Sequence, residues 1–164
     1  MVSLDETLRA KGISSLLYKG RWKRITDRRL NGDGDMFIGA GVTEFGEATK
    51  SDIDLCAEIE ALFGFVLGLN PQLETVPALG MWYNDYDHCF ADNLWVRVGI
   101  PDIDAVFLVL SGTAKDISKG DKIKCVDGVW QRADTNDNFQ MISKEDVTGV
   151  ADTRKYFYAR WVKN

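Results

Sequence analysis

The segment Leu94–Ala133 reads LWVRVGIPDIDAVFLVLSGTAKDISKGDKIKCVDGVWQRA, and it decides the fold class of this 164-residue chain. Two apolar runs, Leu94–Ile100 and Ala105–Leu110, are separated by a Pro-Asp bend, and short apolar runs bounded by turn residues are typical of buried strands. Asp127-Gly128 lies farther along, and this dipeptide favours the positive φ angles of a two-residue hairpin. The segment therefore predicts a small β module, and none of its residues is placed for bond-breaking chemistry.

The remainder of the chain also reads as short strands. Ser51–Ala61 fits either a short helix capped by Ser51 or a strand with alternating apolar residues, and we favour a strand for its second half. The other expected strands are Met36–Val42, Thr43–Ala48, Phe63–Leu69, Lys122–Val126, Val129–Ala133 and Tyr156–Val162. There is no alternation of strands with helices and no internal repeat. The chain is thus predicted to be mainly β, a compact β-barrel or β-sandwich with an extended N-terminal arm and at most one or two short helices.

Charge is distributed unevenly along the chain. Residues 1–30 contain eight Lys or Arg against three acidic residues, whereas the remaining residues contain twelve basic and twenty-two acidic ones, for a total net charge of −5. We therefore divide the chain into a basic N-terminal arm, residues 1–30, and a β domain, residues 31–164. Such an arm favours an acidic partner surface or nucleic acid, and a solvated strand face is the simpler alternative.

Composition narrows the class of protein further. No apolar run approaches the ~18 residues of a membrane span, and residues 1–10 lack the apolar centre of a secretory signal. Cys56, Cys89 and Cys125 are odd in number and far apart, which argues against a disulfide framework and for a reducing compartment. With a single histidine in the chain, we expect neither a metal nor another cofactor.

Two polar clusters could carry chemistry. Asn31, Asp33 and Asp35 have the spacing that opens a calcium-binding loop, but its later positions lack the required glycine and glutamate, so a β-turn is the better interpretation. A second group could hold a metal or supply His88 as a general base, but a hydrogen-bonded loop is the simpler interpretation. Its members are Asp85, Asp87, His88, Cys89 and Asp92.

The same region is rich in aromatic residues. Trp82, Tyr83, Tyr86 and Phe90 could stack nucleic-acid bases, but the acids among them would repel a phosphate backbone. We expect these four residues to form an interface loop.

The order of motifs in the opening segment resembles tailed-bacteriophage head decoration, or cement, proteins. The resemblance covers residues 36–162 and includes the Gly64–Gly68 strand. Its motifs are Val96-Arg97-Val98, the Pro-Asp bend, Val106–Leu110, Ser111-Gly112-Thr113, Ile117-Ser118-Lys119-Gly120-Asp121 and the Asp-Gly hairpin. In the turn, Gly120 would allow a positive φ and Asp121 would cap the turn through its carboxylate.

The resemblance implies a non-enzymatic virion protein, made in the host cytoplasm, that binds the outer capsid surface and stabilises the lattice. The implied partners are the major capsid protein and further copies of this chain, with a trimer favoured. We expect the capsid contacts in the arm, with Trp22 as the anchor, because Trp and Arg dominate interface hot spots. The predicted contact residues are Arg21, Trp22, Lys23, Arg24, Arg28 and Arg29.

Two other functions remain open from the sequence. One is a nucleic-acid-binding module that uses the basic N-terminal segment, although the acidic balance of the chain makes nucleic acid the less favoured partner. The other is a small carbohydrate-active enzyme that uses loop residues 85–92, since any two loop acids could converge.

Overall fold

The computed structural model describes residues in the ranges 2–3, 16–31, 36–45, 52–57, 61–70, 73, 90 and 92–162. Every regular element in these ranges is a β-strand, and the strands form two sheets, one of which closes into a barrel. The predicted mainly β fold is therefore confirmed. No helix within the described ranges is long and apolar enough to cross a bilayer.

The barrel has the strand order β3-β5-β4-β6-β7, and β7 closes it by pairing with β3. Its strands are β3 (Trp22–Leu30), β4 (Gly41–Phe45), β5 (Asp52–Leu55), β6 (Gly64–Leu69) and β7 (Trp95–Pro101). Val96 and Val98 are fully buried while Arg97 between them is exposed, the alternation expected of a strand with one face in the core. Each strand of the barrel thus pairs with two neighbours, and the contact between β3 and β5 is confined to Arg29 and Leu30 of β3.

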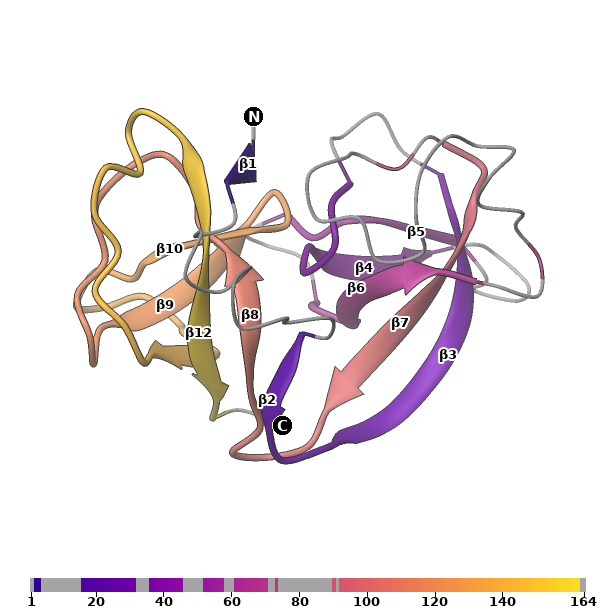
Figure 1. Ribbon diagram of the computed structural model, residues 1–164, viewed down its shortest axis with the longest axis horizontal. Coiled ribbons are helices and arrows are strands. Elements are labelled where there is room, and N and C mark those ends of the chain that lie inside the picture. Colours follow the sequence, from indigo (N-terminus) through magenta and orange to yellow (C-terminus); the bar gives the residue numbers. More distant parts are fainter. Residues whose placement is uncertain are drawn as a thin grey trace.

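The second sheet has the order β10-β9-β11-β12-β8-β2, with β1 pairing in parallel with β12. Its strands are β1 (Val2–Ser3), β2 (Leu17–Lys19), β8 (Val106–Leu110), β9 (Lys122–Val126), β10 (Val129–Arg132), β11 (Met141–Ser143) and β12 (Arg154–Trp161). Just beyond β8, Ser111 bridges Trp130 of β10, and the Gly112 amide donates to the Trp130 carbonyl at 2.7 Å. The sheet thus curls back on itself beside the barrel (Figure 1).

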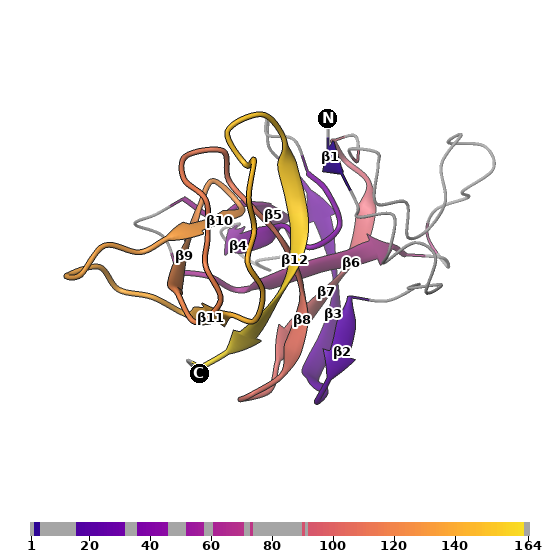
Figure 2. The same cartoon turned by 60° about the vertical axis from the view of Figure 1, so that its left-hand side comes forward.

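One bent ribbon connects the barrel with the second sheet. β2 leads into β3 and β7 leads into β8, so the antiparallel pairs β3–β7 and β2–β8 continue one another around the bend. Gly20 lies at the bend with a φ of +88°, and an added Cβ would lie 2.9 Å from the Ala105 Cα, so glycine is required there. The β2–β3 and β7–β8 connections lie at the same end of the molecule (Figures 1 and 2).

A shared aromatic core joins the two halves. The fully buried ring of Phe65 on β6 has its centroid 4.6 Å from that of Phe107 on β8, and 5.8 and 5.9 Å from those of Trp130 and Trp161. The Tyr156 hydroxyl of β12 donates to the Ile38 carbonyl at 2.6 Å. Such contacts contribute beyond the burial of apolar area, so the two sheets are expected to unfold together.

The Asp127-Gly128 hairpin forms a second junction. The φ angles of Asp127 and Gly128 are 50° and 79°, which confirms the predicted two-residue turn. The Gly128 amide donates to the Cys56 carbonyl at 3.0 Å, and the Gly128 carbonyl accepts from the Gly41 amide at 2.9 Å. The hairpin tip is therefore bonded to barrel backbone on both sides, and the buried thiol of Cys125 lies beside Cys56.

The predicted boundary between an arm and a β domain at residue 30 falls within the fold, because Leu17–Lys19 is a strand of the second sheet and Trp22–Leu30 is a strand of the barrel. β3 pairs with β7 along its length and with β5 at its end, so it closes the barrel. Its sequence looks too polar for a core strand, but backbone pairing and ion pairs hold it in place. Residue 1 and residues 4–15, the remainder of the predicted arm, lie outside the described residues.

Several strands lie at other positions than the sequence predicts. In the region from 51 to 61 the described strand is β5, which lies in the first half; residues 58–60 of the second half, where a strand was expected, lie outside the described residues. Where two strands were expected from 36 to 48, the described residues 36–45 contain β4, and Met36 forms an isolated bridge to Phe90. β11 was not expected from the sequence. The predicted turn at Ser118–Asp121 is confirmed, since Gly120 has a φ of 91° and the Asp121 carboxylate accepts from the Ser118 amide at 2.8 Å.

Candidate functional site

The first of the predicted contact residues lie where the ribbon bends. Arg21 is exposed, and its Nε donates to the Asp102 carboxylate at 2.7 Å. This hydrogen bond holds the pKa of Asp102 below its ordinary value. Lys23 and Arg24 follow on β3 and are exposed, and within the described part of the chain neither forms an ion pair. These two side chains are therefore the ones left available to an acidic partner.

Trp22 is not an exposed anchor. Its ring centroid lies 4.9 Å from that of Phe107, and a Cβ added at Gly99 would lie 2.8 Å from its indole. Gly99 thus leaves the space that the Trp22 ring fills. The side chain is half-buried against the core of its own chain, so its first role is packing.

Arg28 and Arg29 form ion pairs with other strands of the barrel. The Arg28 guanidinium, whose side chain is only 15% exposed, contacts the Glu44 carboxylate at 3.3 Å and lies 4.9 Å from the centroid of the Phe63 ring. Arg29 donates to both Asp52 carboxylate oxygens, at 3.1 and 3.0 Å. These contacts tie β3 to β4 and β5. The predicted contact residues are therefore not one site. The bend presents Lys23 and Arg24, whereas Arg28 and Arg29 at the far end of β3 are paired within their own chain, Arg29 with its side chain 43% exposed.

Most of the predicted interface loop lies outside the described residues. This applies to Trp82, Tyr83 and Tyr86, and also to the cluster residues Asp85, Asp87, His88 and Cys89 and to Asp33 and Asp35. Phe90 is described and is 3% exposed, so its side chain belongs to the core. Among the described residues, no group of three His, Cys, Asp or Glu side chains comes together in a way that could hold a metal ion.

The second sheet presents a surface that the sequence did not reveal as a unit. On β2 and β12, the rings of Tyr18 and Tyr158 have centroids 5.1 Å apart, and Tyr18 is 71% exposed. The Lys144 amide donates to the Tyr158 carbonyl at 2.9 Å, and the Gly120 amide donates to the Ser143 carbonyl at 2.8 Å. The backbone thus places Lys144 beside Tyr158 and the turn that carries Lys119 beside β11.

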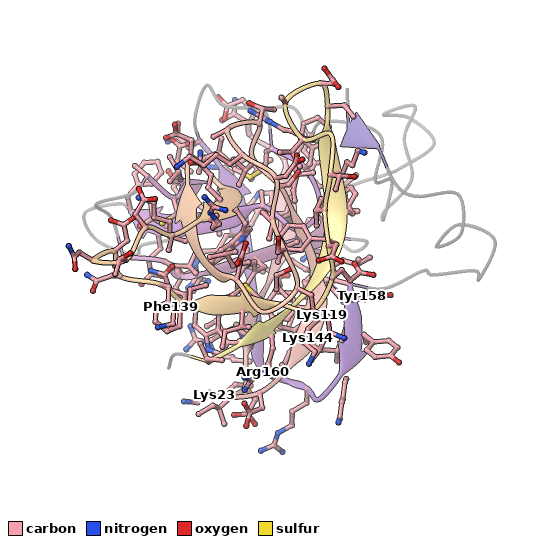
Figure 3. The ribbon with its side chains drawn as sticks, turned by 90° about the vertical axis from the view of Figure 1, so that its left-hand side faces the viewer. Lys23, Lys119, Phe139, Lys144, Tyr158 and Arg160 are labelled. Carbon is pink, nitrogen blue, oxygen red and sulfur yellow. The ribbon has the colours of Figure 1, made fainter. Side chains whose placement is uncertain are left out.

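The same surface continues across the sheet. Ile142 of β11 lies opposite both Arg160 of β12 and Lys122 of β9, and the Lys122 ammonium lies 4.7 Å from the centroid of the Phe139 ring. We call this surface the cationic face, and Figure 3 looks onto it. It consists of Tyr18, Lys119, Lys122, Phe139, Lys144, Tyr158 and Arg160.

The charge of the cationic face is only partly balanced. Arg160 forms an ion pair with Asp104 at 2.7 Å, and the carboxylates of Asp121, Glu145 and Asp146 also lie on this face, where they accept from backbone amides. Lys119, Lys122 and Lys144 are exposed and have no ion pair within the described ranges. Burial raises the pKa of Tyr158, and the Glu145 carboxylate adds to the effect, so its phenol stays neutral at physiological pH. Lysines flanked by rings are suited to bind an anionic surface.

One signal for this face was present in the sequence. The alternation in Tyr156–Val162 places Tyr158 and Arg160 on one side of a strand, as observed, although Tyr156 of the same set is buried. Its neighbours Lys119 and Lys144 come from turns, whose position the alternation does not give.

Comparison with known proteins does not identify a relative: no family model matches the chain, and no curated protein sequence matches it.

Proposed function

We propose that this chain is a non-enzymatic structural protein of a bacteriophage virion that attaches to the outer surface of the capsid and stabilises its lattice. The observation that carries the proposal is the cationic face, where Lys119, Lys122 and Lys144 are exposed and form no ion pair with any described residue, on a chain with a net charge of −5. Exposed lysines that are not held in ion pairs favour docking toward an acidic partner.

Two further observations support this proposal. The strands and turns that carry the resemblance to decoration proteins are formed, including β7, β8 and the Gly120-Asp121 turn. The twin-sheet body shares one aromatic core, which gives a rigid platform for surface contacts. The proposed partners are the major capsid protein and further copies of the chain, with a trimer as the expected assembly.

Co-sedimentation with empty heads of the corresponding phage tests the proposal. The wild-type protein is expected to sediment with heads at a fixed stoichiometry and to dissociate as salt is raised, since exposed charges are screened. The double variant Lys119→Glu, Lys144→Glu is expected to bind at least about tenfold more weakly. Lys115→Glu is the matched control, because Lys115 is exposed but already pairs with Asp134 at 3.6 Å.

The same experiment separates the alternative functions. A wild-type protein that ignores heads overturns the proposal. If it also retains labelled single-stranded DNA in a salt-dependent manner, the cationic face acts on nucleic acid instead.

A further inference from the structure

A small pocket lies at the junction between the barrel and the second sheet. Its volume is about 110 Å³, and β3, β6, β7 and β12 all contribute to its wall. Apart from Lys23 and a backbone glycine, the lining is apolar: Leu62, Phe63, Phe65, Ile100, Pro101 and Trp161. An apolar pocket with one charged group at its edge is the usual form of a specific recognition site.

The size of the pocket restricts its occupant. A cavity of about 150 Å³ accepts benzene, so a pocket of 110 Å³ suits a smaller group, such as a branched aliphatic side chain. Buried Phe65 and Trp161 form a rigid part of the wall. Arg28 packs over the Phe63 ring and fixes a further part of it. The pocket is therefore expected to be formed before a partner arrives.

Charge restricts the occupant further. Lys23 lines the pocket, and the Arg24 guanidinium lies 6.0 Å from the centroid of the Phe63 ring. Both side chains are exposed and have no ion pair in the described part of the chain. The nearby carboxylate of Asp102 is already bound by Arg21 at 2.7 Å. The rim is thus cationic around an apolar floor, which is complementary to an aliphatic residue flanked by carboxylates.

We infer that this pocket receives an acidic segment of a partner protein, which inserts one aliphatic side chain and places carboxylates against Lys23 and Arg24. This inference rests on the proposed function, in which the partner is a capsid subunit. In this arrangement the pocket provides the specific contact, and the cationic face provides general electrostatic attraction. The position at the bend lets both surfaces contact one partner, because Lys23 lies close enough to Asp102 to lower its pKa and Arg160 pairs with Asp104 (Figure 3).

Head-binding assays with matched variants test the inference. Ile100→Phe fills the pocket, and Lys23→Glu reverses the charge at its rim. Each is expected to weaken binding at least tenfold. Leu73→Phe is the control for the first change, since Leu73 is 56% exposed and follows the C-terminal end of β6, whereas the pocket lies at its start. Lys115→Glu is the control for the second change. Both controls are expected to bind within twofold of wild type, and thermal melting of each protein confirms that it is folded.

The outcomes separate the inference from the proposed function. If the wild-type protein binds heads and the folded pocket variants bind equally well, the pocket is not the anchor and the function stands. If the wild-type protein does not bind heads, the proposed function fails and the inference fails with it. Carbodiimide cross-linking adds a direct readout, because it joins a lysine amine to a carboxylate as an amide. A Lys23 cross-link to an acidic capsid residue is expected, and cross-links confined to other lysines would contradict the inference.

Discussion

Replacing Trp22 with alanine separates a packing role from a direct role in attachment. The Trp22 ring lies 4.9 Å from that of Phe107, and it covers the space above Gly99. Removing a fully buried aromatic side chain costs about 3–5 kcal/mol of unfolding free energy. Because Trp22 is only partly buried, we expect a loss of about 2–3 kcal/mol.

Urea unfolding followed by far-UV circular dichroism measures this loss. With a slope of about 2 kcal/mol/M, the unfolding midpoint should fall by about 1 M or slightly more. A double-mutant cycle of Trp22→Ala with Phe107→Ala should give a coupling energy of about 1 kcal/mol. Ile25→Ala on the same strand is the control, because Ile25 is 53% exposed and should change stability by less than about 0.5 kcal/mol. An unchanged midpoint for Trp22→Ala together with lost attachment would refute the packing role.

Other substitutions test the remaining structure. Gly128→Ala should lower the free energy of unfolding by about 3 kcal/mol, because the φ of Gly128 is +79° and an added Cβ would lie 2.5 Å from Leu55 of β5. Gly120→Ala should lower it by only about 1 kcal/mol, because Gly120 has a φ of +91° but lies in open space. Equal urea midpoints for the two variants would contradict this difference. The thiols of Cys56 and Cys125 are buried and should react with iodoacetamide at neutral pH only when the protein unfolds locally. Peptide mass spectrometry measures the labelling, and rapid labelling of either thiol in the native protein would contradict the prediction. The hydrogen bond to Cys56, together with burial, raises the pKa of the Cys125 thiol well above 9.0. The neutral thiol therefore stabilises the fold below the ordinary thiol pKa, and this stabilisation is lost as the pH rises through the raised pKa. Urea unfolding at increasing pH measures the loss. Deleting residues 1–30 removes β2 and β3 and should abolish the native circular dichroism spectrum, whereas a folded deletion variant would contradict the barrel closure.

The sequence predicted the elements whose pattern is local. Alternation around Val96 and Val98, the run Val106–Leu110 and the Asp127-Gly128 turn each depend on neighbouring residues, and each appears where it was expected. A two-residue hairpin specifies its own register, because the turn fixes which residues face one another.

The elements that were missed depend on distant partners. β3 has few apolar residues, and what holds it is pairing with β7 and the contacts of Arg28 with Glu44 and of Arg29 with Asp52. Those acids lie far from the arginines in sequence, so no local pattern reveals the pairs. The pocket and the cationic face are also products of tertiary structure, since each gathers residues from at least three separate strands or turns.

The chemistry of the basic residues explains why only some of the cations predicted as contacts on β3 remain available to a partner. A guanidinium can bond two carboxylate oxygens at once, as Arg29 does with Asp52, and this geometry suits a fixed internal contact. An ammonium on a flexible stem is strongly hydrated and stays in solvent, as at Lys23, Lys119 and Lys144. Contacts made by such lysines are individually weak and sensitive to salt. Under the proposed function, firm attachment therefore depends on several copies engaging a repeating lattice, and the pocket at the bend supplies the specificity that exposed lysines lack.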